Sequence, residues 1–354
     1  MQRNIYNQLL RWKNKKTRKP LILNGARQVG KTYILREFGQ KEYQKVAFFS
    51  LDRDQKVREV FEKSGSTADI LMALSAISQV DITPGDTLLV LDEIQDCPKA
   101  LEALKFFCEE TPDIHIVVAG SLLGLSLHDG TSYPVGKVEE MRLYPMTFLE
   151  FLNAMGKTQL VEIIENKKWA VVNMLQMELI GLLRQYYYVG GMPAAVRAHV
   201  EHNSLQEIRS IQLQILADYR RDFSKHAPAR EVPRINMVWD SIPPQLAKEN
   251  KKFIYGALKK SARAKDFEIA IQWLIDAGLA YKVVRVNAPR LPLKFYEDTD
   301  AFKLFMLDVG LMGAMAETPA ELMLVNDDVF SEYKGAFTEL YVFTQLKALG
   351  MSLY

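Results

Sequence analysis

Residues 25–32 read Gly25-Ala26-Arg27-Gln28-Val29-Gly30-Lys31-Thr32 and fit the pattern G-x-x-x-x-G-K-[ST] in full. They follow the short apolar run Leu21 to Asn24 and open a helical pattern, which is the setting that a phosphate-binding loop requires. Glycines at 25 and 30 let the backbone curl so that successive amides face inward and bind phosphate together with the helix N-terminus. The segment therefore predicts a strand, a phosphate-binding loop and a helix.

The residues of this loop predict a nucleotide site. Lys31 is expected to reach the β- and γ-phosphates, and the Thr32 hydroxyl is expected to ligate Mg²⁺. The full set of nucleotide-binding residues is expected to be Gly25, Arg27, Gln28, Val29, Gly30, Lys31, Thr32 and Tyr33. No Asn-Lys-x-Asp guanine signature occurs, which favours ATP over GTP. Since the sequence has a single loop of this kind, a helicase with two tandem motor folds in one chain is excluded.

Two further segments place polar side chains where strands are expected to end. Leu88 to Glu93 reads LLVLDE, and open α/β sheets bind ligands at the carboxyl ends of their strands. We expect Asp92 to hold the Mg²⁺ shell and Glu93 to activate a water for in-line attack on the γ-phosphate. Ser121 follows the apolar run Ile114 to Gly120 and has two interpretations, a catalytic residue beside the γ-phosphate or a cap for the next helix.

The first half of the chain alternates short apolar runs with helical patterns, as βαβ units do. Further strands are expected at Lys45 to Asp52, Thr87 to Glu93, Ile114 to Gly120 and Glu139 to Pro145. Helices are expected from the phosphate loop to Gly39, over Thr67 to Gln79 and over Pro98 to Glu110. The predicted fold class is α/β, with a parallel, doubly wound sheet of five strands that ends near residue 150.

The second half has a different pattern. Helical spacing extends from Met146 to Tyr219 and is broken at the turn Gly190 to Pro193. A proline-rich connection, Arg230 to Pro244, then leads into two expected helices and a strand, the outline of a winged helix: Phe253 to Ala262, Asp266 to Ala277 and Leu279 to Val286. The tail predicts a strand over Lys303 to Asp308 and a helix over Lys334 to Leu349.

Composition limits the class of protein. The chain has 354 residues, of which 48% are hydrophobic and 25% charged, so wholesale disorder is excluded and more than one domain is expected. The net charge of +2 restricts any nucleic-acid surface to a local patch. Two cysteines, Cys97 and Cys108, exclude a disulfide scaffold and a structural zinc cluster and indicate a reducing, cytoplasmic compartment. The sequence has neither an apolar run of membrane-spanning length nor a secretory signal.

Weaker patterns each have a structural alternative. His199 and His202 have the spacing of a metal pair, but no carboxylate or thiol accompanies them, which favours a solvated helix face. The basic run Lys13 to Lys19 fits phosphate contact or a charged linker. Tyr186 to Tyr188 are expected in a helical core rather than stacked on bases. Four basic residues fit either a DNA-facing helix or a solvated face: Lys259, Lys260, Arg263 and Lys265.

Six segments in this order resemble a prokaryotic family of AAA-type ATPases: GARQVGKT, LLVLDEIQ, VVAGSLLG, RLYPMTFLEFL, YYYVGGMPAAV and KLFMLDVGLM. The resemblance covers nearly the whole chain, and the fourth and fifth segments are its most specific parts. It implies that Lys31 and Thr32 are the phosphate-loop pair. It also implies that Asp92 and Glu93 are the metal-binding and water-activating carboxylates, and that Ser121 is the sensor.

The resemblance further implies an order of domains and strands. The expected domains are an AAA core over 1–150, a helical lid over 151–215, a winged helix over 216–290 and part of a restriction-endonuclease-like domain over 291–354. Within the core, the strand of the catalytic glutamate is expected between the phosphate-loop strand and its neighbour.

The chain departs from this family in two places. Relatives often carry an arginine before the fifth strand, a candidate finger for a neighbouring subunit, where this chain has Lys137 without the guanidinium fork. Arg142 is the alternative finger. The nuclease carboxylate and lysine would follow Tyr354, so the last domain is expected to be cut short and the chain is not expected to cut DNA. Glu339 is the acidic residue that we connect with such a site.

Together these features predict Mg²⁺-dependent ATP hydrolysis with Glu93 as general base, coupled to movement of the C-terminal domains. The expected partners are ATP, DNA through the winged-helix region and further copies of the chain, with no membrane. Three hypotheses stay open. ATP controls DNA engagement, or it drives a regulatory switch that acts on a partner protein, or it is held as a structural ligand.

Overall fold

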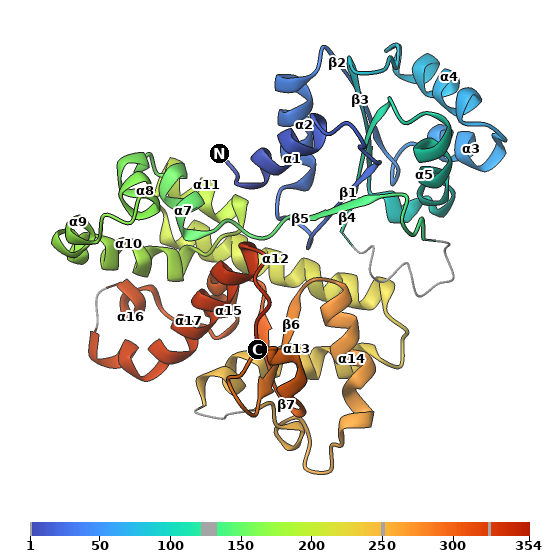
Figure 1. Cartoon of the computed structure of the whole chain (residues 1–354). Helices are drawn as coiled ribbons and strands as arrows, with labels where there is room; N and C mark the ends of the chain where they lie inside the picture. Colours follow the sequence, from blue (N-terminus) through green and yellow to red (C-terminus); the bar gives the residue numbers. More distant parts are fainter. Residues whose placement is uncertain (1, 122–132, 249–251, 325–326) are drawn as a thin grey trace. The chain divides into compact units, whose positions relative to one another are not determined.

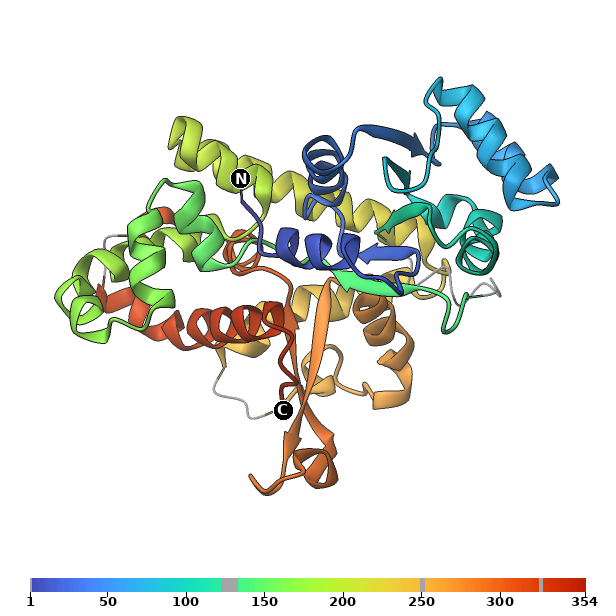
Figure 2. The same cartoon turned by 45° about the horizontal axis from the view of Figure 1, so that its top comes forward.

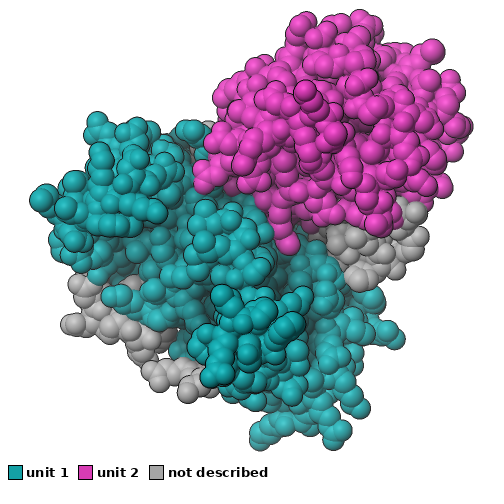
Figure 3. All heavy atoms as spheres, in the orientation of Figure 1, with its two compact units in different colours: residues 1–2, 144–354 teal, residues 3–143 magenta. Residues whose placement is uncertain are grey.

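The computed structural model describes residues 2–121, 133–248, 252–324 and 327–354. The chain forms two compact units, which Figure 3 shows in different colours. The sheet unit comprises residues 3–143, and the helical unit comprises residues 144–354 with the first two residues. In the described part of the chain, no helix combines the length and the apolar character needed to cross a membrane.

Five parallel strands form the centre of the sheet unit, in the order β2-β3-β4-β1-β5 (Figure 1). They are β1 (Leu21–Asn24), β2 (Lys45–Ser50), β3 (Thr87–Asp92), β4 (His115–Gly120) and β5 (Glu139–Arg142). All six residues of β3 and all six of β4 are buried, because these mostly apolar strands lie inside the sheet and are covered on both faces. The expected parallel five-stranded α/β sheet is confirmed, with earlier ends for β2, β3 and β5 and a later start for β4.

The position of the glutamate strand differs from the expectation. β3, which ends just before Glu93, does not neighbour the phosphate-loop strand β1, because β4 lies between them and pairs with both. Strand order follows from which buried faces pack together in space, and the local pattern of each strand carries no information about it. Ser121 directly follows β4. It therefore lies at the end of the strand between β1, which leads into the phosphate loop, and β3, which leads to the two carboxylates.

The helices of the sheet unit are α1 (Ile5–Lys13), α2 (Lys31–Glu42), α3 (Gln55–Lys63), α4 (Thr67–Ser78) and α5 (Pro98–Glu110), with a short 3₁₀ turn, η1 (Ile94–Asp96), after β3. Figure 1 shows α1 and α2 on one side of the strands and α3, α4 and α5 on the other. The second group packs apolar side chains such as Val57, Leu74 and Leu104 into one buried cluster with Leu89 and Leu91 of β3. This doubly wound arrangement leaves the carboxyl ends of the strands to the loops.

Two helices differ from their expected bounds. α3 has no counterpart among the expected helices, although Val57, Val60 and Phe61 stand at helical spacing and face one buried cluster. α2 continues past Gly39, where it was expected to end. Gly39 is instead a close contact with the sheet, since a Cβ there would lie 2.8 Å from Val46 Cγ2 and 3.4 Å from Leu88 Cδ2. The glycine therefore brings α2 close to β2 and β3.

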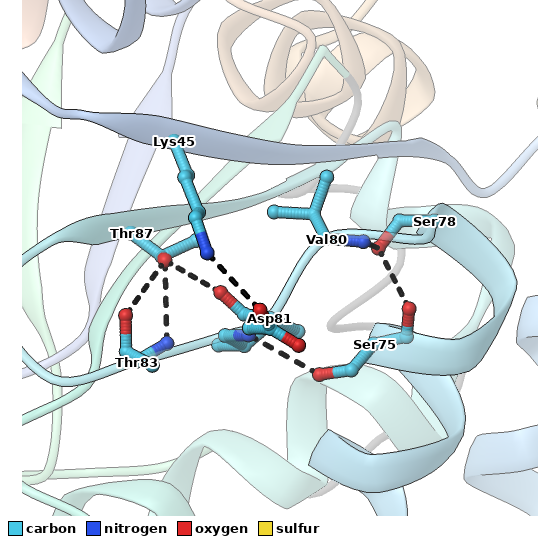
Figure 4. Close-up of polar contacts among 8 residues, drawn as sticks. Lys45, Ser75, Ser78, Val80, Asp81, Thr83 and Thr87 are labelled. Atoms are coloured by element: carbon cyan, nitrogen blue, oxygen red, sulfur yellow. Dashed lines mark hydrogen bonds and ion pairs between the residues drawn. The ribbon is translucent and has the colours of Figure 1, made fainter.

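The connection from α4 to β3 anchors the beginning of β3 (Figure 4). Thr87 Oγ1 donates to the carbonyl of Asp81 at 2.8 Å and accepts from the amide of Thr83 at 3.2 Å. The Asp81 carboxylate in turn pairs with Lys45 Nζ, at the start of β2, at 3.1 Å. Because these bonds hold the first residue of β3, the strand delivers its carboxylates to the opposite edge of the sheet in a defined register.

The helical unit contains one two-stranded antiparallel sheet among its described residues, β6 (Ala280–Val286) with β7 (Glu297–Met306). Two 3₁₀ turns are η3 (Tyr255–Ala257) and η4 (Leu293–Tyr296). Its helices, in chain order, are α7 (Phe148–Ala154), α8 (Thr158–Glu165), α9 (Trp169–Met174), α10 (Gln176–Val189), α11 (Pro193–His202), α12 (Leu205–His226), α13 (Val232–Ala247), α14 (Ala264–Asp276), α15 (Val309–Met315), α16 (Ala320–Leu324) and α17 (Asp327–Ala348). Figure 2 shows α17 and β6 from a second direction.

Two expectations for this unit were wrong. Arg230 to Pro244 is not a connection but lies mostly in α13, because four apolar residues at helical spacing are fully buried: Ile235, Val238, Trp239 and Ile242. The helix expected over Phe253 to Ala262 is reduced to the turn η3. The backbone of Phe253 instead donates to the carbonyl of Phe302 in β7 at 2.6 Å, and the two rings stack at 5.4 Å.

A buried carboxylate ties the Gly190-Gly191 turn to α15. Asp308 Oδ2 accepts from the amide of Gly191 at 2.6 Å, and Oδ1 accepts from the amide of Leu311 at 2.9 Å. Burial raises the pKa of Asp308 to about 6, against these backbone bonds, which lower it. A Cβ on Gly191 would lie 2.1 Å from the carbonyl oxygen of Met146, so this turn requires glycine. Two of the segments that carry the family resemblance thus meet in the core of the helical unit.

Candidate active site

The phosphate loop connects β1 to α2 at the carboxyl edge of the sheet. Gly30, the residue before α2, has φ = 95°, in the left-handed region that favours glycine. Gln28 also has a positive φ of 65°. A Cβ on Gly25 would lie 2.4 Å from the carbonyl oxygen of Leu143. Gly30 is therefore required by its backbone conformation, and Gly25 is required by the close approach of the Leu143 carbonyl.

Lys31 is enclosed by this loop. Its side chain is 7% exposed, and Nζ donates to the carbonyl oxygens of Gly25 and Ala26 at 2.9 Å each. Burial lowers the pKa of Lys31 to about 8, and the nearby charges of Glu93 and Asp92 oppose that shift. A partly desolvated ammonium of this kind gains from an anionic partner such as a phosphate.

Thr32 and Asp92 meet from two different elements. Thr32 Oγ1 donates to Asp92 Oδ2 at 2.6 Å, and the backbone amide of Glu93 donates to Asp92 Oδ1 at 3.1 Å. Burial raises the pKa of Asp92, while the bond from Thr32 lowers it. The structure thus brings the hydroxyl after the loop lysine onto the carboxylate at the end of β3.

This oxygen pair fits a magnesium ion held partly by its substrate. Hydroxyl and carboxylate oxygens are the ligands that Mg²⁺ prefers, and the ion usually keeps waters and phosphate oxygens in its other positions. Among residues 2–121, 133–248, 252–324 and 327–354, no group of three or more histidines, cysteines and carboxylates could hold a metal unaided. The donor set therefore suits Mg²⁺ bound with nucleotide phosphates better than a resident metal.

Glu93 follows β3 with a left-handed backbone, φ = 54°. Its carboxylate oxygen Oε2 accepts from Gln95 Nε2 at 2.7 Å and from Ser121 Oγ at 3.2 Å. Ser121 is 5% exposed, so its hydroxyl is turned toward Glu93 rather than toward solvent. The alternative role of Ser121, a cap for a following helix, falls on residues that the structure does not describe.

The side chains of the other expected nucleotide-binding residues differ in their exposure to solvent. The Val29 side chain is fully buried, so this residue can offer a ligand only its backbone. Arg27 is half-buried, Gln28 is exposed and Tyr33 is 58% exposed. Each of them lies in the loop or in the first turn of α2.

Two residues at the site were not predicted from the sequence. Gln95, in the turn η1, touches Glu93; the signal for it was its place two residues after Glu93 in the quoted segment LLVLDEIQ. Arg3 is 7% exposed and its Nη1 donates to the carbonyl of Val29 at 3.1 Å, which ties the N-terminal segment to the phosphate loop. No local pattern around Arg3 predicts this contact, because it depends on where α1 packs.

The two candidate finger residues lie in different surroundings. Lys137 Nζ pairs with Glu109 Oε1 of α5 at 2.8 Å, on an exposed surface. Arg142 ends β5 in register with Asn24, the last residue before the phosphate loop. Of the two, Arg142 is therefore the one at the carboxyl edge of this sheet.

The weaker candidates resolve into structural contacts. His199 is buried and stacks on Phe151 at 5.6 Å, whereas His202 is exposed and pairs with Glu207 at 2.9 Å, so the two do not share a metal site. The expected solvated face is thus wrong for His199. Tyr186 to Tyr188 are buried in the helical unit, as predicted. The cysteines are free, as expected.

Several charged candidates have partners of their own. In the basic run, Lys13 pairs with Glu42 at 3.5 Å and Lys15 with Glu139 at 2.9 Å. Glu339 accepts from Lys303 Nζ at 2.6 Å. The four basic residues near the expected winged helix are all exposed and lie between η3 and the first turn of α14: Lys259, Lys260, Arg263 and Lys265.

Comparison with known proteins relates both units to other chains. A family model described as an AAA domain matches residues 17–152, and a domain of unknown function (DUF8612) matches residues 180–322. The Walker-type ATPase of Pyrococcus abyssi is similar in structure over 89% of this chain and 95% of its own, with a TM-score of 0.54 and 13% identity. Among curated proteins, none matches the sequence.

Two other solved structures are more distant. The Aeropyrum pernix ORC1 protein, solved in complex with DNA, is 13% identical over 91% of this chain and 92% of its own, with a TM-score of 0.33. RuvB of Thermotoga maritima is 15% identical over 83% of this chain and 90% of its own, with a TM-score of 0.37. Similarities this low do not bear on function.

The AAA match spans the phosphate loop, the carboxylate strand and Ser121. The sheet unit is therefore an AAA-type P-loop ATPase domain, and the chain is an ATPase that binds and hydrolyses nucleotide. The likeness to the Pyrococcus abyssi protein shows a shared fold over most of both chains. The model that matches residues 180–322 assigns no activity to the helical unit.

Proposed function

We propose that this chain hydrolyses Mg·ATP at the carboxyl edge of the sheet, with Glu93 as general base. The convergence of Thr32, Asp92, Glu93 and Ser121 carries the proposal. Thr32 in the first turn of α2 contacts Asp92 at the end of β3 at 2.6 Å, and Ser121 after β4 contacts Glu93 after β3 at 3.2 Å. Lys31, enclosed by the loop, is the donor for the β- and γ-phosphates.

The proposed reaction is an in-line displacement. Glu93 takes a proton from a water whose oxygen bonds to the γ-phosphorus, while the bond from that phosphorus to the β,γ-bridging oxygen breaks. ADP and inorganic phosphate leave with the bonding electrons on the former bridging oxygen. When bound between Thr32, Asp92 and the phosphates, Mg²⁺ supplies neutralisation of the charge on the phosphate oxygens. Arg142, or an arginine from another copy of the chain, is proposed as the finger that adds to it.

The finer assignments for the helical unit are proposals as well. We assign a lid to residues 151–215, a winged helix to 216–290 and part of an endonuclease-like domain to 291–354, in a cytoplasmic protein that forms homo-oligomers. Support for the winged helix comes from α13, α14 and β6, which follow one another within residues 216–290. The antiparallel partner of β6 is β7, which begins after residue 290. Nucleotide state is proposed to move these domains and so to control contact with DNA through Lys259, Lys260, Arg263 and Lys265. The alternative is a regulatory switch that acts on a partner protein.

Phosphate release from Mg·ATP by the purified chain tests the core of the proposal. Glu93→Gln is expected to abolish turnover while ATP still binds, and Lys31→Ala is expected to lose ATP binding. Because Gln replaces the carboxylate without a change of shape, retained turnover in Glu93→Gln would refute its role as general base.

Duplex DNA added to the same assay separates the two candidate roles. A rise in turnover with DNA supports control of DNA engagement, whereas slow turnover that DNA leaves unchanged supports the protein switch. The triple variant Lys259→Ala/Lys260→Ala/Arg263→Ala is expected to bind DNA more weakly and with a smaller dependence of affinity on salt. Each lost contact with a DNA phosphate lowers both the affinity and its salt dependence. Wild-type DNA affinity in that variant would exclude this surface.

A further inference from the structure

Two buried acceptor atoms receive no hydrogen bond from the described residues of the sheet unit. Among its described residues, the buried side-chain polar atoms without a partner are Asn24 Oδ1 and Gln95 Oε1. Asn24 ends β1 in register with Gly120, next to Ser121, and Gln95 lies two residues after Glu93. Both atoms are amide oxygens, and both belong to residues at the carboxyl edge of the sheet. A buried acceptor is unfavourable without a donor, so this edge is suited to bind a donor such as water.

The orientation of the Gln95 amide follows from chemistry. Its Nε2 lies 2.7 Å from Glu93 Oε2, and an ionised carboxylate accepts hydrogen bonds but donates none. The NH₂ group must therefore face Glu93. Because the amide is planar, this contact also fixes the direction of Oε1, which lies on the other branch of the fork.

This contact differs from the other glutamine–carboxylate contacts in the described residues. Gln55 with Glu59 (3.2 Å), Gln214 with Asp218 (2.9 Å) and Gln272 with Asp276 (2.8 Å) are exposed pairs four residues apart. Such pairs stabilise the surface of a helix. Gln95 instead contacts a residue two positions earlier, from the short turn η1, and its free oxygen is buried.

We propose that Gln95 is a positioning residue that orients the attacking water. Its Nε2 holds the Glu93 carboxylate, and its Oε1 accepts one hydrogen of the water while Glu93 accepts the other. A lone pair of the water oxygen is then directed at the γ-phosphorus. As the new oxygen–phosphorus bond forms and the bridging bond breaks, the proton on Glu93's side transfers to Glu93, and the proton held by Gln95 stays on the phosphate product. This inference rests on the proposed function of Glu93.

Gln95→Met tests the inference, since methionine keeps the length of the side chain and removes both amide atoms. Turnover is expected to fall about 10- to 100-fold, with the KM for ATP within about twofold of wild type and an unchanged Tm. Gln55→Met removes an exposed amide–carboxylate contact in the same unit and is the matched control, expected to keep wild-type turnover.

Binding of two phosphate mimics separates water positioning from a structural role. ADP with aluminium fluoride imitates the transferring phosphoryl group in the transition state, and ADP with beryllium fluoride imitates the ground state. Gln95→Met is expected to weaken trapping of the aluminium complex at least about tenfold and to leave the beryllium complex unchanged. A merely structural residue would weaken both complexes alike.

The outcomes keep the inference distinct from the proposed function. If Glu93→Gln abolishes turnover while Gln95→Met turns over within twofold of wild type, the Gln95 inference is overturned and the function of Glu93 stands. If Glu93→Gln stays active, the proposed function itself fails. Should Gln95→Met not fold, Gln95→Asn decides, because it keeps an amide but withdraws it by one methylene; full turnover there would also overturn the inference.

Discussion

Thr32 Oγ1 lies 2.6 Å from Asp92 Oδ2, although 60 residues separate them in the sequence. Thr32 lies in the first turn of α2 and Asp92 ends β3, so the contact depends on how the phosphate loop and the carboxylate strand are aligned. β1, which leads into the phosphate loop, does not pair with β3, because β4 lies between the two strands. The contact therefore depends on the packing of the whole sheet edge.

Thr32→Val is expected to lower Mg²⁺-dependent turnover about 10- to 100-fold, because valine keeps the shape of threonine but lacks the hydroxyl proposed to ligate the ion. Thr32→Ser keeps the hydroxyl and is expected to retain most activity. Titration of phosphate release with Mg²⁺ distinguishes the variants. Equal magnesium dependence in Thr32→Val and wild type would contradict the assignment of Thr32.

Gly25→Ala is expected to weaken ATP binding about 10- to 100-fold, because its Cβ would lie 2.4 Å from the Leu143 carbonyl oxygen and the loop must shift. Gly65→Ala is the control in the same unit, since nothing lies within 4 Å of its Cβ position. Equilibrium titration with a fluorescent ATP analogue measures both. Wild-type affinity in Gly25→Ala would show that the loop accommodates the methyl group.

The surroundings of His115 predict that the folded protein loses stability in mild acid. Its Nδ1 lies 2.6 Å from the Tyr43 hydroxyl, and burial, together with Arg18 and Lys13, lowers its pKa to about 4 from 6.5 while Asp113 opposes the shift. Between these values the unfolded chain binds a proton that the folded chain does not. The free energy of unfolding therefore falls by about 3 kcal/mol as pH drops through this window.

Urea unfolding at several pH values measures this slope. The double variant Tyr43→Phe/His115→Phe removes the titrating ring without leaving the tyrosine hydroxyl unpaired, and is expected to show a shallower slope between pH 6.5 and pH 4. The same slope in both proteins would mean that His115 is not the group that titrates.

Gly191→Ala is expected to destabilise the helical unit by about 2–4 kcal/mol. Its Cβ would lie 2.1 Å from the Met146 carbonyl oxygen, and the shift that relieves this overlap breaks the bond to Asp308. Gly181→Ala lies in α10 with open space around it and is expected to stabilise the unit by up to about 1 kcal/mol. Denaturant unfolding gives both values, and unchanged stability in Gly191→Ala would contradict the close contact.

The phosphate loop and the carboxylate pair could be predicted from sequence because each is a local pattern with a local physical cause. Glycines at 25 and 30 meet backbone needs, and the apolar run before Asp92 marks a strand covered on both faces. The same reasoning located every strand of the sheet. It missed α3, and it failed for Arg230 to Pro244, where several prolines obscured the helical period.

Other features depend on contacts between elements distant in the chain. The place of β4 between β1 and β3 decides that Ser121 reaches Glu93, and the packing of α1 brings Arg3 to the carbonyl of Val29. The free oxygen of Gln95 becomes significant once its burial and its neighbour are known. Local pattern carries information on backbone conformation and on which side chains avoid water. Which buried faces meet, and which polar atoms lack a partner, follows from packing in three dimensions.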